Sequence, residues 1–224
     1  MNNSFYQAFV FDMDGTIVSS IDDIAASVNY SLELHHLPTR TVAEYVTFIG
    51  NGSVKLIERA LGKDHLDCFQ SVFDDYYDYY QNHYADLTHP FKGLIEALDY
   101  AKEKQVLLFI YTNKPEKIAL ALTEKCFGKG YFAKMVGIPL GGKVKPDPKA
   151  FLEATSSYHL DMNKVAYFGD SGTDILTATN LGIKNIYSVS WGYKTKAFLQ
   201  SFTPQPKAIL DNPLDIKKVV DNQI

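Results

Sequence analysis

The sequence predicts an α/β fold in which helices cover both faces of a parallel sheet. Short apolar runs of strand length recur along the chain, and they lack the strict alternation of apolar and polar residues that marks a half-exposed strand. Segments with the helical spacing of apolar residues separate these runs. A third feature is a stretch from about residue 17 to 87 that breaks this rhythm and shows helical periodicity only.

Five apolar runs are expected to form the sheet. In chain order they are residues 8–11, 106–111, 165–168, 186–189 and the weaker 208–210. Helices are expected between them, because residues three or four positions apart lie on one face of a helix. This spacing is found in Leu94, Leu98 and Ala101, in residues 118–125 and in residues 175–181.

The stretch 17–87 is predicted to be a helical insertion after the first strand. It has tyrosine-rich amphipathic segments, whose tyrosines we expect to pack its interior. Its boundaries are expected at residues 19–20 and 88–90, where Pro90 restricts the preceding residue to an extended conformation. We therefore predict a Rossmann-like core of about residues 1–16 and 88–224, and a smaller helical domain of about residues 17–87.

The charge balance argues against large polyanions as partners. The 224 residues include 22 basic and 26 acidic ones, which gives a formal net charge of -4. Nucleic acids and anionic membranes are bound through a basic surface, so we expect neither as a partner. With 46% hydrophobic and 21% charged residues, the composition is that of an ordinary globular protein.

The sequence also predicts a cytoplasmic location. Its polar start leads directly into a short apolar run, without the features of a signal peptide, and no run approaches the roughly 20 apolar residues of a membrane helix. Cys68 and Cys126 lack the spacing of a zinc site or a disulfide framework, so both are expected to be reduced thiols. A monomer and a homodimer both remain open.

An acidic pair follows the first expected strand. Asp12 and Asp14 are two residues apart, so in extended chain both carboxylates point the same way, and Gly15 then permits a sharp turn. Ligands of open α/β sheets bind beyond the carboxyl ends of the strands. Two carboxylates there favour a bound cation, and oxygen ligands favour Mg²⁺.

Three other segments bring polar groups to the same edge of the sheet. Thr112, Asn113 and Lys114 follow the run 106–111, and Lys145 lies in a loop before a helix. The run 165–168 leads to the last two acids, Asp170 and Asp174. Together these residues supply the acids, the hydroxyl and the lysine that a phosphate site needs.

These four motifs, in this order, resemble those of the haloacid dehalogenase superfamily of phosphatases, and the resemblance spans nearly the whole chain. Within the superfamily the sequence is most similar to phosphoglycolate phosphatases, through the segments 50–52, 59–61 and 112–115. The resemblance implies Mg²⁺-dependent hydrolysis of a small phosphorylated metabolite, with 2-phosphoglycolate as the leading candidate. The sequence departs from the family pattern at Ser19, where an acidic residue is usual, and at residues 171–173, where a charged residue and an asparagine are common.

The resemblance also assigns roles to the motif residues. It implies that Asp12 attacks phosphorus to form a phospho-aspartyl intermediate, while Asp14 protonates the leaving group and later activates water. It implies that Thr112, Asn113 and Lys145 bind the phosphoryl group. The metal site would be formed by Asp12, Asp14 through its backbone carbonyl, Asp170, and Asp174, which acts through the metal shell or by orienting Lys145.

Two residues of the insertion are candidates for substrate binding, Gly52 and Arg59. Lys55 and Arg59 share a helix face, which either faces the active site or is simply solvated. For Asp170 and Asp174, capping of the helix expected near residue 173 is an alternative that can coexist with metal binding.

Other readings of the whole chain also remain open. The same superfamily contains sugar phosphomutases of the β-phosphoglucomutase type and pyrophosphatases; Thr16, where such mutases often have valine, favours hydrolysis. A module that has kept the fold and lost catalysis is a further alternative. The Asp-x-Asp-Gly segment also begins calcium loops, but it follows a strand here and position twelve is Asp23 rather than glutamate.

Overall fold

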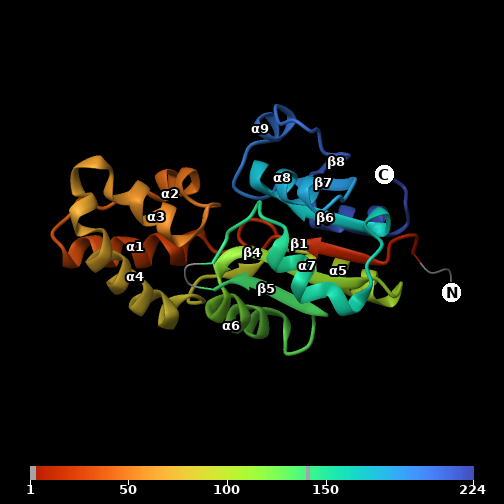
Figure 1. The fold of residues 1–224 in the computed structure, drawn as a ribbon, viewed down its shortest axis with the longest axis horizontal. Coiled ribbons are helices and arrows are strands. Elements are labelled where there is room, and N and C mark those ends of the chain that lie inside the picture. Colours follow the sequence, from red (N-terminus) through yellow and green to blue (C-terminus); the bar gives the residue numbers. More distant parts are fainter. Residues whose placement is uncertain (1–3, 140–141) are drawn as a thin grey trace.

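The computed structural model describes residues 4–139 and 142–224 and confirms the predicted α/β fold class (Figure 1). Its larger sheet has the strand order β5-β4-β1-β6-β7-β8, and every neighbouring pair in it is parallel. The strands, in that order, are β5 (Lys134–Ile138), β4 (Leu107–Pro115), β1 (Ala8–Phe11), β6 (Val165–Gly169), β7 (Asn185–Val189) and β8 (Ala208–Leu210). This order places β1 in the interior of the sheet, between β4 and β6.

Alternate residues of β1 enter two separate apolar cores, because successive side chains of a strand point to opposite faces. Phe9 and Phe11 belong to one core, and Ala8 and Val10 belong to the other. The helices that contribute to the first core are α5 (Leu94–Glu103), α6 (Glu116–Phe127) and α10 (Ile216–Val220), and those of the second are α7 (Lys149–Thr155) and α8 (Gly172–Asn180). The sheet is therefore covered on both faces, as its continuous apolar runs predicted.

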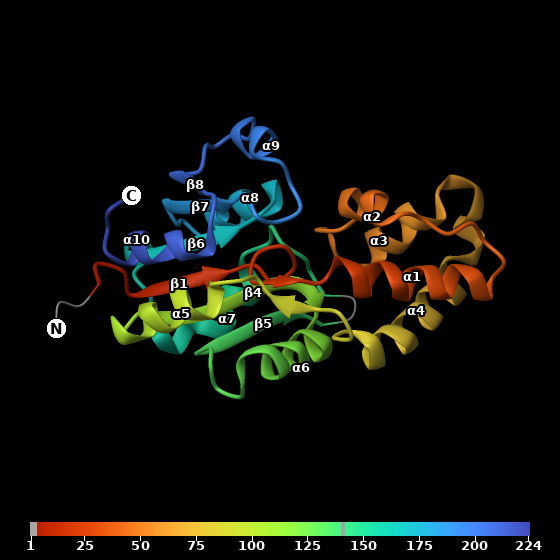
Figure 2. The same cartoon turned by 180° about the vertical axis from the view of Figure 1, so that it is seen from behind.

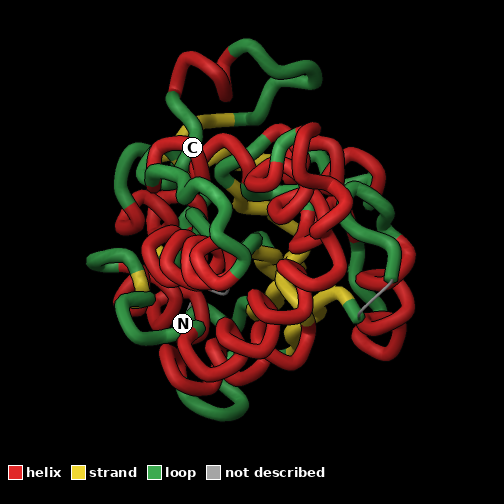
Figure 3. Tube along the Cα trace, turned by 90° about the vertical axis from the view of Figure 1, so that its left-hand side faces the viewer, coloured by secondary structure: helices red, strands yellow, loops and turns green. Residues whose placement is uncertain are grey.

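Helices α1 to α4 stand beyond one end of the sheet, on the side away from both termini (Figures 1 and 2). They are α1 (Ile21–Leu34), α2 (Val42–Phe48), α3 (Gly52–Leu61) and α4 (Phe69–His83). Their apolar faces share a third core, which includes Val28, Tyr45, Ile57, Tyr76 and Tyr80. Viewed from this end of the molecule, helices surround the strands (Figure 3).

Two short strands connect the helical insertion to the sheet. They are β2 (Val18–Ser19) and β3 (His89–Pro90), which pair antiparallel where the chain leaves the core and returns to it. Buried Asp23 joins the same two segments, because its carboxylate accepts hydrogen bonds from the backbone N–H groups of Leu87 and Thr88 and from the Thr88 hydroxyl. The two chain segments that connect the insertion to the sheet are therefore bound to each other.

The remaining elements are short. They are α9 (Lys196–Gln200) and the 3-10 helices η1 (Lys63–Cys68), η2 (Ser156–Tyr158), η3 (Met162–Lys164) and η4 (Pro213–Asp215). None of the helices in the described residues has the length and apolarity needed to cross a membrane.

The structure differs from the expected strands in more than the short pair β2 and β3, which the sequence did not predict. Strand β5 was not predicted, because Lys134, Met135 and Gly137 dilute its apolar pattern, and it forms through its pairing with β4. Strand β4 continues to Pro115, beyond the expected end at residue 111. Thr112, Asn113 and Lys114 therefore belong to the strand itself, in a stretch where its pairing with β5 is irregular.

Candidate active site

The carboxyl ends of three adjacent strands and the helical insertion enclose one cleft. Asp12 follows β1, Thr112 lies in β4 and Asp170 follows β6, and all three line it. From the insertion, Tyr76 of α4 and Ser53 of α3 line the opposite side. The structure thus brings together the strand-end residues that are far apart in the sequence.

Hydrogen bonds to the backbone and to one carboxylate oxygen of Asp12 fix its position in the cleft. Its N–H donates to the carbonyl of Phe168 at 2.9 Å, which ties it to β6. Its Oδ1 accepts a hydrogen bond from Lys145 Nζ at 2.8 Å, and its side chain is 13% exposed. No protein hydrogen bond to Oδ2 is found in the described chain, so this oxygen is available for chemistry.

Lys145 is held between two carboxylates. Its Nζ lies 2.8 Å from Asp12 and 2.7 Å from Asp174, and its side chain is only 2% exposed. The backbone of Lys145 is held too, since its N–H donates to the Asn113 side-chain oxygen at 2.6 Å. A buried ammonium needs such partners, so the ion pairs fix where the positive charge lies.

Asp174 combines two of the roles that the sequence left open. It lies in the first turn of α8, where its Oδ2 accepts from the N–H and the hydroxyl of Ser171, the N-cap residue. Its Oδ1 accepts from Lys145. Both oxygens therefore already have protein partners, one capping the helix and the other orienting the lysine.

Asp170 lies close to Asp12 and Asp174, and carboxylate oxygens of the three acids all fall within 4.8 Å of one another. The N–H of Tyr193 donates to its Oδ2 at 2.6 Å. Gly192 allows this approach, because a Cβ there would lie 2.4 Å from the Asp170 Cβ and 2.3 Å from the Gly15 carbonyl oxygen. The hydrogen bond from the loop after β7 therefore holds the Asp170 carboxylate close to Asp12 and Asp174.

The pKa values of Asp12 and Asp170 are raised at this site. Burial, with the Asp174 carboxylate, raises the pKa of Asp12 to about 7, against the opposing effect of Lys145. Burial, together with Asp174 and Asp12, also raises the pKa of Asp170 well above its ordinary value. For Lys145, burial alone would lower the pKa, but the Asp12 and Asp174 carboxylates outweigh it and hold the pKa well above its usual range.

This donor set fits a divalent cation. A buried cluster of carboxylates with raised pKa values is stabilised by a positive ion, and oxygen-only donors suit Mg²⁺. Among the three acids of this cluster, both oxygens of Asp174 have protein partners, so Asp12 and Asp170 are the side chains best placed to hold an ion. The carbonyl of Asp14 is expected to complete the protein part of the site.

Asp14 lies at the mouth of the site, with its side chain 19% exposed. Its Oδ1 accepts from Ser20 at 2.5 Å and from Lys114 at 2.8 Å. Gly15 follows with a φ of 85°, the left-handed conformation that turns the chain back after the acidic pair.

The phosphate-binding candidates are placed differently. Thr112 is buried and lines the cleft, where its hydroxyl accepts the N–H of Lys114 at 3.2 Å and keeps its own proton free to donate. The amide of Asn113 instead joins backbone groups, since it donates to the Gly50 carbonyl at 2.9 Å and accepts from Lys145. Asn113 therefore links the core to the insertion.

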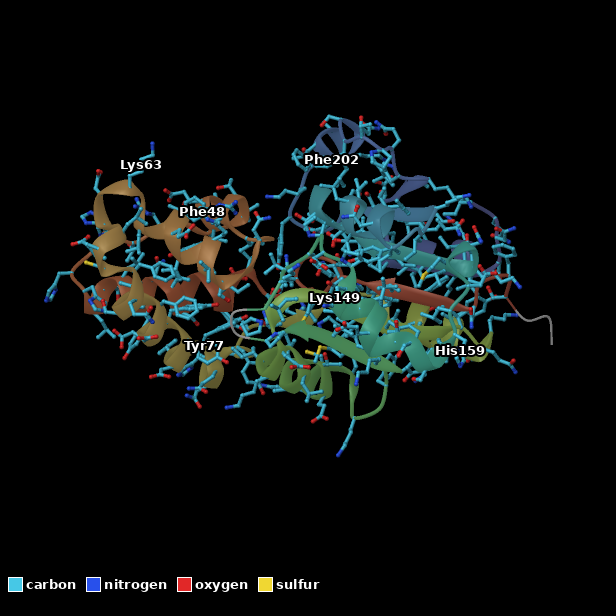
Figure 4. The ribbon with its side chains drawn as sticks, in the orientation of Figure 1. Phe48, Lys63, Tyr77, Lys149, His159 and Phe202 are labelled. Carbon is cyan, nitrogen blue, oxygen red and sulfur yellow. The ribbon has the colours of Figure 1, made fainter. Side chains whose placement is uncertain are left out.

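The candidates from the insertion also differ in whether they line the cleft. Gly52 lines the cleft at the start of α3. Arg59 is exposed, and its guanidinium donates to the carbonyl of Phe48, which Figure 4 labels in the insertion, and to the side chain of Asn51. Lys55 is also exposed and pairs with Glu58. Among the described residues that line the cleft, neither of these two cations is found.

The cleft is also lined by polar residues to which the sequence analysis gave no catalytic or binding role, among them Lys114, Tyr80, Tyr193 and Lys194. Tyr193 accepts from the N–H groups of Ser20 and Ile21, at 2.7 and 3.0 Å. Lys194 donates to the Val46 carbonyl of the insertion at 2.7 Å. Only the position of Lys114 directly after Thr112 and Asn113 offered a signal in the sequence. The positions of the other three residues depend on tertiary packing.

The chain is similar to known proteins over most of its length. The model of the haloacid dehalogenase-like hydrolase family matches residues 9–187. A phosphoglycolate phosphatase of Mesorhizobium japonicum is 33% identical over 199 residues, which cover 87% of each chain. A phosphoglycolate phosphatase of Neisseria gonorrhoeae is 30% identical over 213 residues, 91% of this chain and 89% of the other.

A solved structure shares the same architecture. It is that of a predicted phosphoglycolate phosphatase from Haemophilus somnus 129pt, with a TM-score of 0.85 and 26% identity. The match covers 96% of this chain and 98% of the other, so it includes the helical insertion as well as the sheet.

Proposed function

The chain belongs to the haloacid dehalogenase-like hydrolase family and is a phosphatase, as its motifs predicted, and on this premise we propose that it hydrolyses a small phosphomonoester with Mg²⁺ through a phospho-aspartyl intermediate on Asp12. The observation that carries the proposal is the position of Asp12. Buried Lys145 holds one of its oxygens, and the other is left facing a cleft lined by Thr112 and Asp170.

The proposed reaction has two displacements at phosphorus. In the first, the Asp12 oxygen forms a bond to phosphorus while the bond to the leaving oxygen breaks, and Asp14 gives its proton to that oxygen. In the second, Asp14 takes a proton from water, the water oxygen bonds to phosphorus, and the bond to Asp12 breaks. Inorganic phosphate, the free Asp12 carboxylate and the protonated Asp14 carboxyl result.

The remaining residues of the site would bind the transferring group. Lys145 carries a charge fixed next to Asp12, and the Thr112 hydroxyl has a proton to donate, so both suit the phosphoryl oxygens. Asp12 and Asp170, which lie in one cluster with Asp174, would hold Mg²⁺, and the family resemblance adds the Asp14 carbonyl. When bound, this ion would neutralise the charge of the phosphoryl group and of the crowded acids.

We propose 2-phosphoglycolate as the leading substrate candidate. Two curated relatives named phosphoglycolate phosphatases are at least 30% identical to the chain and align over most of it. Besides Lys145, the cleft is lined by the cation Lys194, which suits a substrate with an acidic group besides its phosphate. Asn113 and Gly52 would shape the cleft, and Arg59 would act from outside it by holding the loop after α2.

We further propose that residues 17–87 act as a cap domain over a core of residues 1–16 and 88–224. The cap's own apolar core and the paired strands β2 and β3 at its base support this division. A seated cap would exclude water until the phospho-enzyme has formed. The free cysteines Cys68 and Cys126 are consistent with a cytoplasmic location, and we propose a monomer or homodimer.

The test is phosphate release from 2-phosphoglycolate with Mg²⁺ and with a chelator. We expect activity that depends on the ion, and its loss in the Asp12→Asn variant. Asp74→Asn is the control, because Asp74 is exposed on α4, outside the cleft, and accepts a hydrogen bond from Gln70. Undiminished activity of Asp12→Asn, or transfer of phosphate to a sugar phosphate without release, would contradict the proposal.

A further inference from the structure

The carboxyl group of Asp14 is held by two donors that come from different parts of the fold. Ser20, at the start of α1, donates its hydroxyl to Oδ1 at 2.5 Å. Lys114, in β4, donates to the same oxygen at 2.8 Å. Within residues 4–139 and 142–224, Oδ2 of Asp14 accepts no hydrogen bond from the protein. The two oxygens of this carboxyl are therefore not equivalent.

Lys114 is as deeply buried as Lys145, with a side chain that is 2% exposed. A lysine is rarely buried without a specific partner, because its charge loses the solvation of water. Its ion-pair partner is Asp14, and its second partner is the hydroxyl of Tyr80. The proposed phosphate-binding role of Lys145 leaves this second buried lysine without a function.

Tyr80 connects Lys114 to the cap. It is buried in the third apolar core, on α4, and its ring centroid lies 4.9 Å from Lys114 Nζ. Burial, with the nearby Asp14 and Asp23 carboxylates, raises the pKa of Tyr80 well above its ordinary value, so its hydroxyl stays neutral. Lys114 therefore spans from a residue of the cap to the acid of the core.

We infer that Lys114 is a positioning residue for Asp14: it fixes Oδ1 and leaves Oδ2 to carry the proton to the leaving oxygen. Through Tyr80, this orientation depends on the cap being seated over the sheet. The inference rests on the proposed function, because it concerns the acid of that reaction. A lysine that bound the substrate directly would instead act on affinity.

The leaving group provides the test. An alkoxide needs a proton as it leaves, whereas 4-nitrophenolate does not, so only an alkyl ester depends on a well-placed acid. In Lys114→Met we expect the maximal rate of phosphate release from 2-phosphoglycolate and from ethyl phosphate to fall by about 10²-fold or more. The first burst of 4-nitrophenol from 4-nitrophenyl phosphate, followed by stopped flow, should stay within about tenfold of wild type.

Two further variants complete the experiment. Lys149→Met is the matched control, because Lys149 lies on α7 outside the cleft with its side chain 70% exposed (Figure 4), and it should behave as wild type. Tyr80→Phe keeps the ring and loses the hydroxyl. It should lower phosphate release from the two alkyl esters more than it lowers the burst of 4-nitrophenol, although by less than Lys114→Met does. This keeps the inference testable if Lys114→Met does not fold.

Each result separates the possible explanations. Equal losses on all three substrates, or none, would overturn the positioning role while leaving the proposed function intact. A loss on 2-phosphoglycolate alone, with ethyl phosphate unaffected, would instead make Lys114 a ligand of the substrate carboxylate. If wild type released no phosphate from any of the three, the proposed function would fail, and the inference with it.

Discussion

Lys145 Nζ lies 2.8 Å from Asp12 Oδ1, although the two residues are 133 positions apart in the sequence. The same nitrogen lies 2.7 Å from Asp174, so one buried ammonium serves two buried carboxylates. A change at any of these residues therefore affects both the chemistry and the stability of the protein.

Lys145→Met should both inactivate and destabilise the enzyme. The variant leaves Asp12 and Asp174 without their counter-charge, and breaking a buried ion pair in this way typically costs about 3–5 kcal/mol. Urea denaturation at neutral pH measures that loss. Lys143→Met is the control, because the side chain of Lys143 is 79% exposed and its ion pair with Asp147 lies at the surface. If Lys145→Met were as stable as Lys143→Met, the prediction would be wrong, and the Asp12 and Asp174 carboxylates would not need Lys145 as a counter-charge.

The binding of Mg²⁺ should strengthen as pH rises toward 7. The pKa of Asp12 is raised to about 7 in the metal-free protein, and an ion that binds its carboxylate must displace the proton. Below this pKa the affinity should rise by at least about tenfold per pH unit, because the pKa of the second ligand, Asp170, is also raised. Isothermal titration at several pH values measures this dependence. The Asp12→Asn variant should bind weakly and with a shallower dependence on pH, and a flat profile in wild type would contradict the prediction.

The same raised pKa affects stability in the absence of metal. Because the folded-state pKa of Asp12 exceeds its unfolded value, protonation stabilises the fold fully below the unfolded value, near 4, and this contribution is lost as pH rises through about 7. Chelator-treated protein should therefore lose stability between these pH values, and the loss should be smaller in Asp12→Asn. Thermal melting across the range measures this difference.

Much of the core could be predicted because its signals are local. Continuous apolar runs predict strands buried on both faces, and Asp12, Asp14 and Asp170 directly follow such runs. Strands β5, β2 and β3 were not predicted, because they form by pairing with strands that are distant in the sequence or lack a clear apolar pattern of their own. The contact between Lys114 and Tyr80 joins a core strand to a cap helix, so no local pattern could indicate it.

Gly192→Ala should weaken Mg²⁺ binding although residue 192 offers no ligand. Its added Cβ would lie 2.4 Å from the Asp170 Cβ and 2.3 Å from the Gly15 oxygen, so the loop must move away from the acids. Movement of the loop would also disturb the hydrogen bond from the Tyr193 N–H to the Asp170 carboxylate. We expect at least about a tenfold loss of affinity, by analogy with other residues that orient metal ligands. Unchanged affinity by isothermal titration would show that the loop yields without disturbing Asp170.

Asp23→Asn should loosen the base of the cap. The Asp23 carboxylate is buried and accepts hydrogen bonds from the N–H groups of Leu87 and Thr88 and from the Thr88 hydroxyl, so it holds the outgoing and returning segments together. An amide has one acceptor oxygen instead of two, and hydrogen bonds to a charged acceptor contribute about 1.5–3 kcal/mol each. We therefore expect a loss of about 1–3 kcal/mol in urea denaturation. Asp22→Asn is the matched control, because the neighbouring Asp22 is exposed in the same first turn of α1 and shares its charge but not these contacts. If the two variants were equally stable, the backbone pairing of β2 and β3 would by itself hold the cap to the core.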